Sequence, residues 1–146
     1  MNETIKNLEE ALALSPDNVP LRLHLADLML QEKMYTEAGL HFAEVLQKSY
    51  GNTKAQTGLA HCYYNTGKYS AAIIIYEQLQ NQLGPDDTLR FVKCLIKENS
   101  LQEAAAHYQK IIAANPSFRD EEVDSYLRMP SNGGVTAKQL IIQRII

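Results

Sequence analysis

Apolar residues recur along most of the chain with the spacing of an α-helix. From Leu21 to Met29, and again from Leu89 to Ile96, apolar side chains stand three or four positions apart, as one face of a helix requires. Turn dipeptides such as Gly84-Pro85 interrupt this pattern, and short connections make successive helices antiparallel. The pattern predicts three helix pairs, approximately Asn18–Glu32 with Tyr35–Lys48, Asn52–Thr66 with Tyr69–Gln82, and Asp86–Glu98 with Leu101–Ala114.

These predicted pairs are copies of one unit. Leu25-Ala26 returns 34 residues later as Leu59-Ala60. In each second helix an alanine precedes an aromatic ring by four positions, so that a small residue allows close approach while the ring fills the space beside it. We expect these residues in the core: Ala38 with Phe42, Ala72 with Tyr76, and Ala104 with Tyr108.

Single helices are predicted on both sides of the three pairs. Glu3–Leu14 reads as the second helix of an incomplete pair. Ser117 would cap a short helix ending near Arg128, with Val123, Tyr126 and Leu127 on its buried side. The expected organisation is a half-repeat helix in residues 1–17, three repeats in residues 18–116, a capping helix in residues 117–130, and a linker with an amphipathic helix in residues 131–146.

The repeated unit resembles the tetratricopeptide repeat, whose pattern is aromatic-x2-Leu-Gly-x2-Tyr, then Ala-x3-Phe, then Pro, over 34 residues. The second copy matches best, with Leu59-Ala60-x2-Tyr63 and Ala72-x3-Tyr76. The chain departs from the family at the first aromatic position, which holds Arg22, Gln56 and Thr88. The resemblance implies an all-α fold, a right-handed α-solenoid of about three and a half helix-turn-helix repeats with C-terminal capping helices.

In that family the first helix of each pair lines a concave face that holds peptides or partner helices. Here Asp27 would be acidic at one end of the face and Lys54, Lys93 and Lys97 basic at the other, so a partner segment with acidic and apolar residues would fit near the third repeat. Counting outward from the expected core gives the predicted partner-contacting residues: Leu23, Asp27, Leu30, Lys54, Thr57, His61, Tyr64, Asn65, Leu89, Lys93, Ile96 and Lys97.

Composition narrows the classes of protein. The 146 residues are 45% hydrophobic and 21% charged, as in a globular domain and unlike a disordered chain. A net charge of −3 argues against nucleic-acid binding, and no apolar run approaches the ~18 residues of a membrane span. Cys62 and Cys94 are too few for a disulfide framework, which favours reduced thiols and a cytoplasmic location.

The sequence contains no recognisable catalytic or cofactor-binding pattern. Gly67-Lys68 lacks the flanking residues of a phosphate-binding loop, since Cys62 and Tyr69 occupy their places. The histidines lack a ligand partner one helical turn away, so no metal is expected. Cys62 and Cys94 are interpreted as small packing residues. We therefore expect a non-catalytic module with no cofactor that binds a protein or peptide partner.

The last residues leave alternatives open. Val135–Ile146 is amphipathic and ends on two isoleucines, so we expect either a fragment of a longer protein or a segment buried by a partner, and it could pair two chains as a homodimer. Gly133-Gly134 followed by Lys138 and Ile141 is similar to the start of the ATPase module of AAA+ proteins, although Ser131 and Asn132 replace its aspartate and valine. That resemblance implies an alternative function, the substrate-recruiting adaptor region of a AAA+ ATPase truncated before its nucleotide-binding core.

Overall fold

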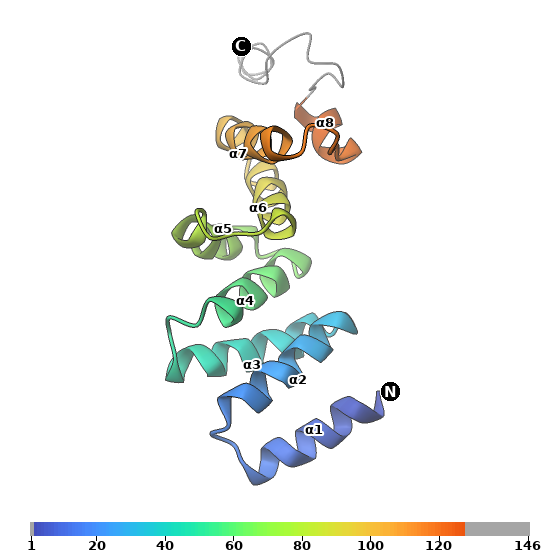
Figure 1. Ribbon diagram of the computed structural model, residues 1–146, viewed down its shortest axis with the longest axis vertical. Coiled ribbons are helices and arrows are strands. Elements are labelled where there is room, and N and C mark those ends of the chain that lie inside the picture. Colours follow the sequence, from blue (N-terminus) through green and yellow to red (C-terminus); the bar gives the residue numbers. More distant parts are fainter. Residues whose placement is uncertain (1, 128–146) are drawn as a thin grey trace. The chain divides into compact units, whose positions relative to one another are not determined.

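The structure, a computed structural model, describes residues 2–127. Within this range the chain is all-helical and contains no strand, which confirms the predicted fold class (Figure 1). The chain divides into two compact units, residues 1–75 and residues 76–146, which are described separately. The described helices are α1 (Glu3–Leu14), α2 (Val19–Gln31), α3 (Tyr35–Lys48), α4 (Thr53–Asn65), α5 (Tyr69–Leu79), α6 (Pro85–Lys97), α7 (Leu101–Ala114) and α8 (Glu121–Leu127).

The helix ends follow the repeat pattern closely. α1, α3 and α7 begin and end at the predicted residues, and α2, α4 and α6 differ from the prediction by one residue at each end. Asn18 and Asn52 cap their helices instead of beginning them, because their side-chain oxygens accept the amide hydrogens of Leu21 at 3.1 Å and Ala55 at 2.9 Å. α5 ends at Leu79, three residues earlier than predicted.

The turn inside each helix pair has one recurring geometry. Lys33, Gly67 and Asn99 occupy equivalent places and have φ values of 62°, 79° and 61°. In each turn the next amide donates to the carbonyl five residues back over 2.8 Å, which is the bond of a left-handed helix-ending motif. Glycine adopts this conformation without strain, whereas a lysine or asparagine does so at a cost.

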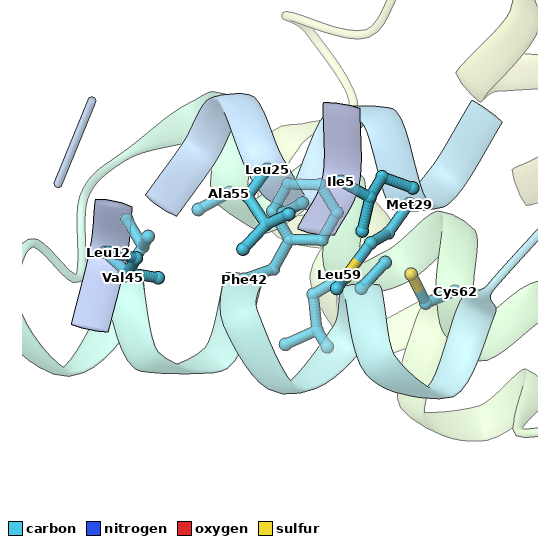
Figure 2. Close-up of a cluster of buried hydrophobic side chains, with 11 residues drawn as sticks. Ile5, Leu12, Leu25, Met29, Phe42, Val45, Ala55, Leu59 and Cys62 are labelled. Carbon is cyan, nitrogen blue, oxygen red and sulfur yellow. The ribbon is translucent and has the colours of Figure 1, made fainter. Parts of the chain in front are cut away.

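In the first unit the core forms where α2, α3 and α4 pack together. The ring of Phe42 is fully buried in this cluster (Figure 2). Gly58 lies against the tip of that ring, and a Cβ added to it would stand only 2.5 Å from the Phe42 Cζ. The predicted small residues are also fully buried, which confirms their place in the core: Ala26, Ala38, Ala60 and Ala72.

In the second unit α6 packs against α7. Tyr76 and Tyr108 are fully buried, as predicted from the repeat. The Phe91 ring lies between Tyr76 and His107, with centroid distances of 5.7 Å and 4.6 Å. The second unit is therefore built around a run of rings in tilted contact.

The capping helix α8 begins later than predicted. Asp120, and not Ser117, is its cap, because the Asp120 carboxylate accepts the amide hydrogen of Val123 at 3.0 Å. Ser117 belongs to the preceding turn, where its hydroxyl donates to Asn115. Val123 and Leu127 are fully buried as expected, but Tyr126 is 43% exposed and the prediction that it is buried was wrong. A helix of seven residues buries only a narrow stripe, and Tyr126 lies beside it.

Candidate partner-binding surface

The predicted residues in the first unit come from α2 and α4, which contact one another. We call this set the first-unit surface: Leu23, Asp27, Leu30, Lys54, Thr57, His61, Tyr64 and Asn65. Leu23 and Leu30 are half-buried and pack against the core. Lys54 and Asn65 are exposed, and the remaining side chains are half-buried. The surface therefore presents apolar groups that are partly covered and polar groups at its edges.

The charges of the first-unit surface cancel. The Lys54 ammonium lies 2.5 Å from an Asp27 carboxylate oxygen, so the expectation that these two residues stand at opposite ends of the face was wrong. An ion pair of this exposure contributes about 0–1 kcal/mol, and it reduces the net charge that a partner meets at this part of the surface.

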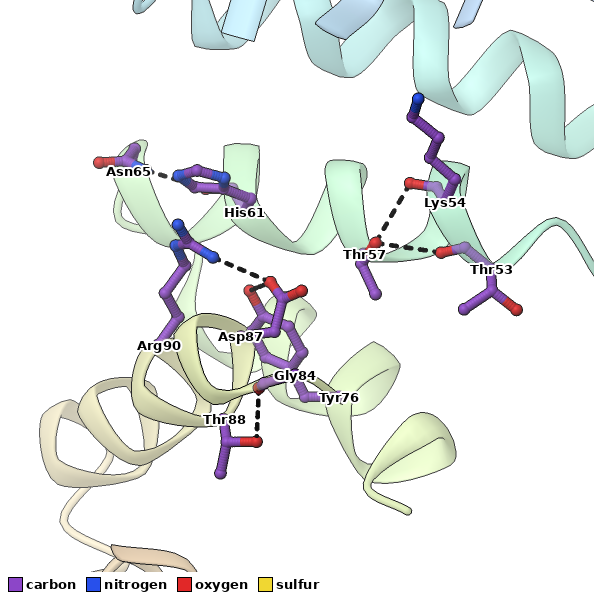
Figure 3. A network of polar contacts seen from close by, with 10 residues as sticks. All are labelled: Thr53, Lys54, Thr57, His61, Asn65, Tyr76, Gly84, Asp87, Thr88 and Arg90. Carbon is purple, nitrogen blue, oxygen red and sulfur yellow. Dashed lines mark hydrogen bonds and ion pairs between the residues drawn. The ribbon is translucent and has the colours of Figure 1, made fainter. Parts of the chain in front are cut away.

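Polar side chains of α4 are bonded within their own helix. The Thr57 hydroxyl donates to the Thr53 and Lys54 carbonyls at 3.1 and 3.2 Å, and the Asn65 amide donates to the His61 carbonyl at 3.1 Å (Figure 3). The His61 ring lies 6.2 Å from that of Tyr35. These bonds fix the side chains at low cost in conformational entropy, so that a partner meets an ordered surface.

The predicted residues in the second unit come from α6. We call this set the second-unit surface: Leu89, Lys93, Ile96 and Lys97. Leu89 is half-buried and Lys97 exposed, but Ile96 is only 6% exposed and belongs to the core. The Lys93 ammonium lies 3.4 Å from the Asp120 carboxylate, so an acidic group of this chain already occupies the place predicted for an acidic partner.

The partner of Lys93 was missed at the sequence level. Asp27 and Lys54, like Lys93 and Asp120, are separated by 27 residues. Each pair joins the first helix of one repeat to the helix that takes the same position one helix pair later. The Asp27–Lys54 pair joins α2 to α4, and the Lys93–Asp120 pair joins α6 to the start of α8. A search for opposite charges at this spacing would have found both pairs.

The two cysteines are buried packing residues. Burial raises the pKa of Cys62 to about 11 and that of Cys94 to about 12, the latter with a smaller contribution from Glu98. A thiol needs a lowered pKa to act as a nucleophile, so neither residue is suited to catalysis. Residues 2–127 contain no cluster of histidine, cysteine and carboxylate that could hold a metal, and no described helix is long and apolar enough to cross a membrane.

Comparison with known families decides the identity of the repeats. A family model of the tetratricopeptide repeat matches residues 1–40 and again residues 29–90, more than half of the chain. The chain belongs to the tetratricopeptide repeat family. Tetratricopeptide repeats generally mediate protein–protein interaction and are typically non-catalytic scaffolds. A comparison with curated proteins finds no match to this chain.

The matched segments cover the first two tetratricopeptide pairs and the start of α6. The third pair, α6 with α7, repeats the buried alanine and the buried ring at Ala104 and Tyr108. The segment predicted to resemble a AAA+ module, residues 131–146, lies outside the described residues.

Proposed function

We propose that this chain is a non-catalytic interaction module that binds protein segments on the first-unit surface and, separately, on the second-unit surface. The single observation that carries this proposal is the ordered, charge-neutral patch of α2 and α4, where Leu23, Leu30 and Tyr64 are partly uncovered. Partly covered apolar groups with polar groups at their edges favour an apolar partner face with polar edges, because burying the apolar area is favourable.

This proposal revises the kind of partner predicted from the sequence. Lys54 and Lys93 were expected to attract an acidic segment, but each is paired with a carboxylate of the chain. An acidic partner would have to displace Asp27 or Asp120 and would gain little. We therefore propose that apolar contacts supply most of the affinity, and that Lys97 at the exposed edge of α6 contributes a weaker preference for acidic neighbours.

The experiment is a selection of displayed random peptides against the full chain, followed by affinity measurements on two variants. Thr57→Arg places a bulky side chain in the middle of the first-unit surface, whereas Gln47→Arg places the same side chain at an exposed position of α3. Selected peptides should lose at least about tenfold in affinity with Thr57→Arg, equivalent to about 1.4 kcal/mol, and bind Gln47→Arg as they bind the wild type. Equal binding to both variants would remove the surface assignment.

Lys93→Glu combined with Lys97→Glu tests the second-unit surface separately. We expect a modest loss of affinity for peptides with acidic residues and little change for uncharged ones. The dimer and the cytoplasmic location stay predictions, as does the AAA+ adaptor alternative, which depends on residues 131–146.

A further inference from the structure

A cavity of about 290 Å³ opens in the second unit. The segment between α5 and α6, the start of α6, the C-terminal half of α7 and the turn after it supply its lining. This lining is largely apolar and includes Leu83, Pro85, Ile111 and Phe118. None of the residues of the second-unit surface lines it. We call it the His107 cavity, after the polar ring in its wall, and it is a different site from the surface proposed above.

His107 is a largely buried residue whose ring nitrogens are not sealed from solvent without a partner. The side chain is 7% exposed and its ring lies against Phe91. No hydrogen bond to its ring is found among residues 2–127. Burial, and then the Lys110 ammonium, lowers the pKa of His107, while Glu77 opposes this shift. The ring is therefore neutral at pH 7 and presents one donor and one acceptor nitrogen.

The first unit has an equivalent groove, a cavity of about 300 Å³ whose lining includes Arg22 and His41. His41 precedes the buried ring of Phe42 as His107 precedes that of Tyr108. An Arg22 guanidinium nitrogen lies 3.0 Å from the His41 Nδ1, and the same side chain donates to the Pro16 carbonyl at 2.9 Å. Arg22 therefore provides the first histidine with a partner, although the groove beside the two residues stays open.

Thr88 takes the place of Arg22 in the third repeat. Its hydroxyl donates to the Gly84 carbonyl at 2.9 Å, within its own helical turn (Figure 3). A threonine is also too short to replace a guanidinium beside the histidine. The exchange of arginine for threonine leaves the His107 ring without the partner that Arg22 provides for His41.

We propose that the His107 cavity binds a bulky apolar side chain of a partner protein that is followed directly by an acidic residue. The apolar wall suits the side chain, and about 290 Å³ lies at the lower limit of ligand pockets, ~300 Å³, so one side chain fits better than a large ligand. Lys110 stands exposed in the cavity lining and has no ion pair within the described part of the chain. Its charge complements an acidic neighbour, and His107 can bond the peptide backbone between the two residues.

The probe is the capped tetrapeptide acetyl-Gly-Phe-Asp-Gly-amide, titrated into the full chain and followed by NMR signals of the His107 ring and the Ile111 methyl groups. We expect saturable shifts of these signals with a Kd on the order of 1 mM, since a single side chain supplies the affinity. Lys110→Gln should weaken binding roughly two- to fivefold, as loss of an exposed ion pair does. The peptide with lysine in place of aspartate should bind more weakly than the original.

Closing the cavity is the sharpest test. Thr88→Arg restores the residue that contacts the histidine in the first repeat, so it should occupy the His107 ring and weaken the shifts. Ala114→Met fills the cavity from an exposed position, and its matched control Ala113→Met lies on the same helix outside the lining. We expect Ala114→Met to lose the peptide and Ala113→Met to keep it, even if Thr88→Arg impairs folding.

Three results would overturn the proposal. One is the absence of shifts at His107 and Ile111 up to several times the expected Kd. Another is equal binding by Ala114→Met and Ala113→Met. The third is a shift of the same signals with protein concentration alone, which would make a second copy the occupant. Because Thr57→Arg leaves this cavity intact, it should bind the tetrapeptide normally, so failure here and failure of the proposed function are distinguishable.

Discussion

Phe42 in the first unit and Tyr76 in the second occupy the same position of the repeat, yet their rings end in opposite kinds of contact. The tip of Phe42 meets Gly58, with no room for a Cβ. The Tyr76 hydroxyl lies 3.5 Å from an Asp87 carboxylate oxygen, and Asp87 is paired with Arg90 at 3.0 Å (Figure 3). Arg90 stands at the position that Gly58 has one repeat earlier. The repeat therefore accommodates either an apolar or a polar contact at the tip of this ring, provided that the ring and the residue that it meets change together.

Tyr108 extends this comparison to the third repeat. Its hydroxyl donates to an Asp124 carboxylate oxygen at 2.8 Å and accepts the Asp120 amide hydrogen at 2.9 Å. Burial is the main reason that the pKa of Tyr108 rises to about 12, so the hydroxyl stays protonated and able to donate. In the second unit a hydroxyl thereby fastens α8 to α7, a role that the ring of Phe42 cannot have.

Disrupting the apolar contact between Phe42 and Gly58 should have the largest effect on stability. Gly58→Ala forces a Cβ into the Phe42 ring and should lower the free energy of unfolding by about 1–3 kcal/mol, as overpacking does. Gly51→Ala is the matched control, because nothing lies within 4 Å of its added Cβ. Chemical denaturation of the full-length variants measures both. Equal denaturation midpoints for the two variants would show that the close contact between Gly58 and Phe42 does not affect stability.

Removing the hydrogen bonds of the Tyr108 hydroxyl should have the next largest effect on stability. Tyr108→Phe makes the third repeat resemble the first, but it leaves the Asp120 amide and the Asp124 carboxylate without the hydroxyl. We expect a loss of about 1–2 kcal/mol, together with faster amide exchange in α8. Tyr50→Phe, at an 86% exposed ring, controls for removal of a hydroxyl. A loss no greater than that of the control would contradict the role of Tyr108.

The turns offer a smaller comparison. Lys33 and Gly67 have the same left-handed backbone, so Lys33→Gly should stabilise the chain by about 0.5–1 kcal/mol and Gly67→Ala should destabilise it by a similar amount. Thermal unfolding of both variants measures the two shifts. Shifts of the same sign would show that backbone strain does not distinguish these turns.

The smallest expected effect is a dependence of stability on pH, which arises from His41 and His107. Burial, and then Arg22, lowers the pKa of His41 below 6.5, and burial likewise lowers that of His107. Below about pH 6.5 the unfolded chain therefore binds more protons than the folded chain, so the stability present above this pH is lost as pH falls. Melting temperatures at about pH 7.5 and about pH 5.5 should differ less in His41→Gln and His107→Gln than in the wild type. An unchanged difference in both variants would contradict this assignment.

Much of the fold could be predicted because the same residue pattern occurs in several copies along the chain. The alanine and the ring in each second helix, as at Ala38 and Phe42, mark the same buried contact in each copy. Helix ends were accurate to a residue wherever a turn of fixed geometry set them, as at Gly67. Periodicity finds the face of a helix that is buried, and copies of one pattern reinforce each other.

The candidate surface was less predictable because periodicity does not say which neighbour covers a side chain. Ile96 lies on the predicted face by its spacing but is buried by packing. Lys93 was predicted to contact an acidic partner, but it already forms an ion pair with Asp120, which follows the last repeat in the sequence. The His107 ring lacks the partner that His41 has because Thr88 is too short to do what Arg22 does, and only the three-dimensional contact shows that difference.

The most direct test of the central claim is an NMR map of the full chain with a peptide obtained by display. If the peptide binds on the first-unit surface, the strongest shifts will fall on Thr57, His61 and Leu30, and Thr57→Arg will remove them. Shifts confined to the exposed side of α3, around Leu40, would place the partner elsewhere and contradict the account.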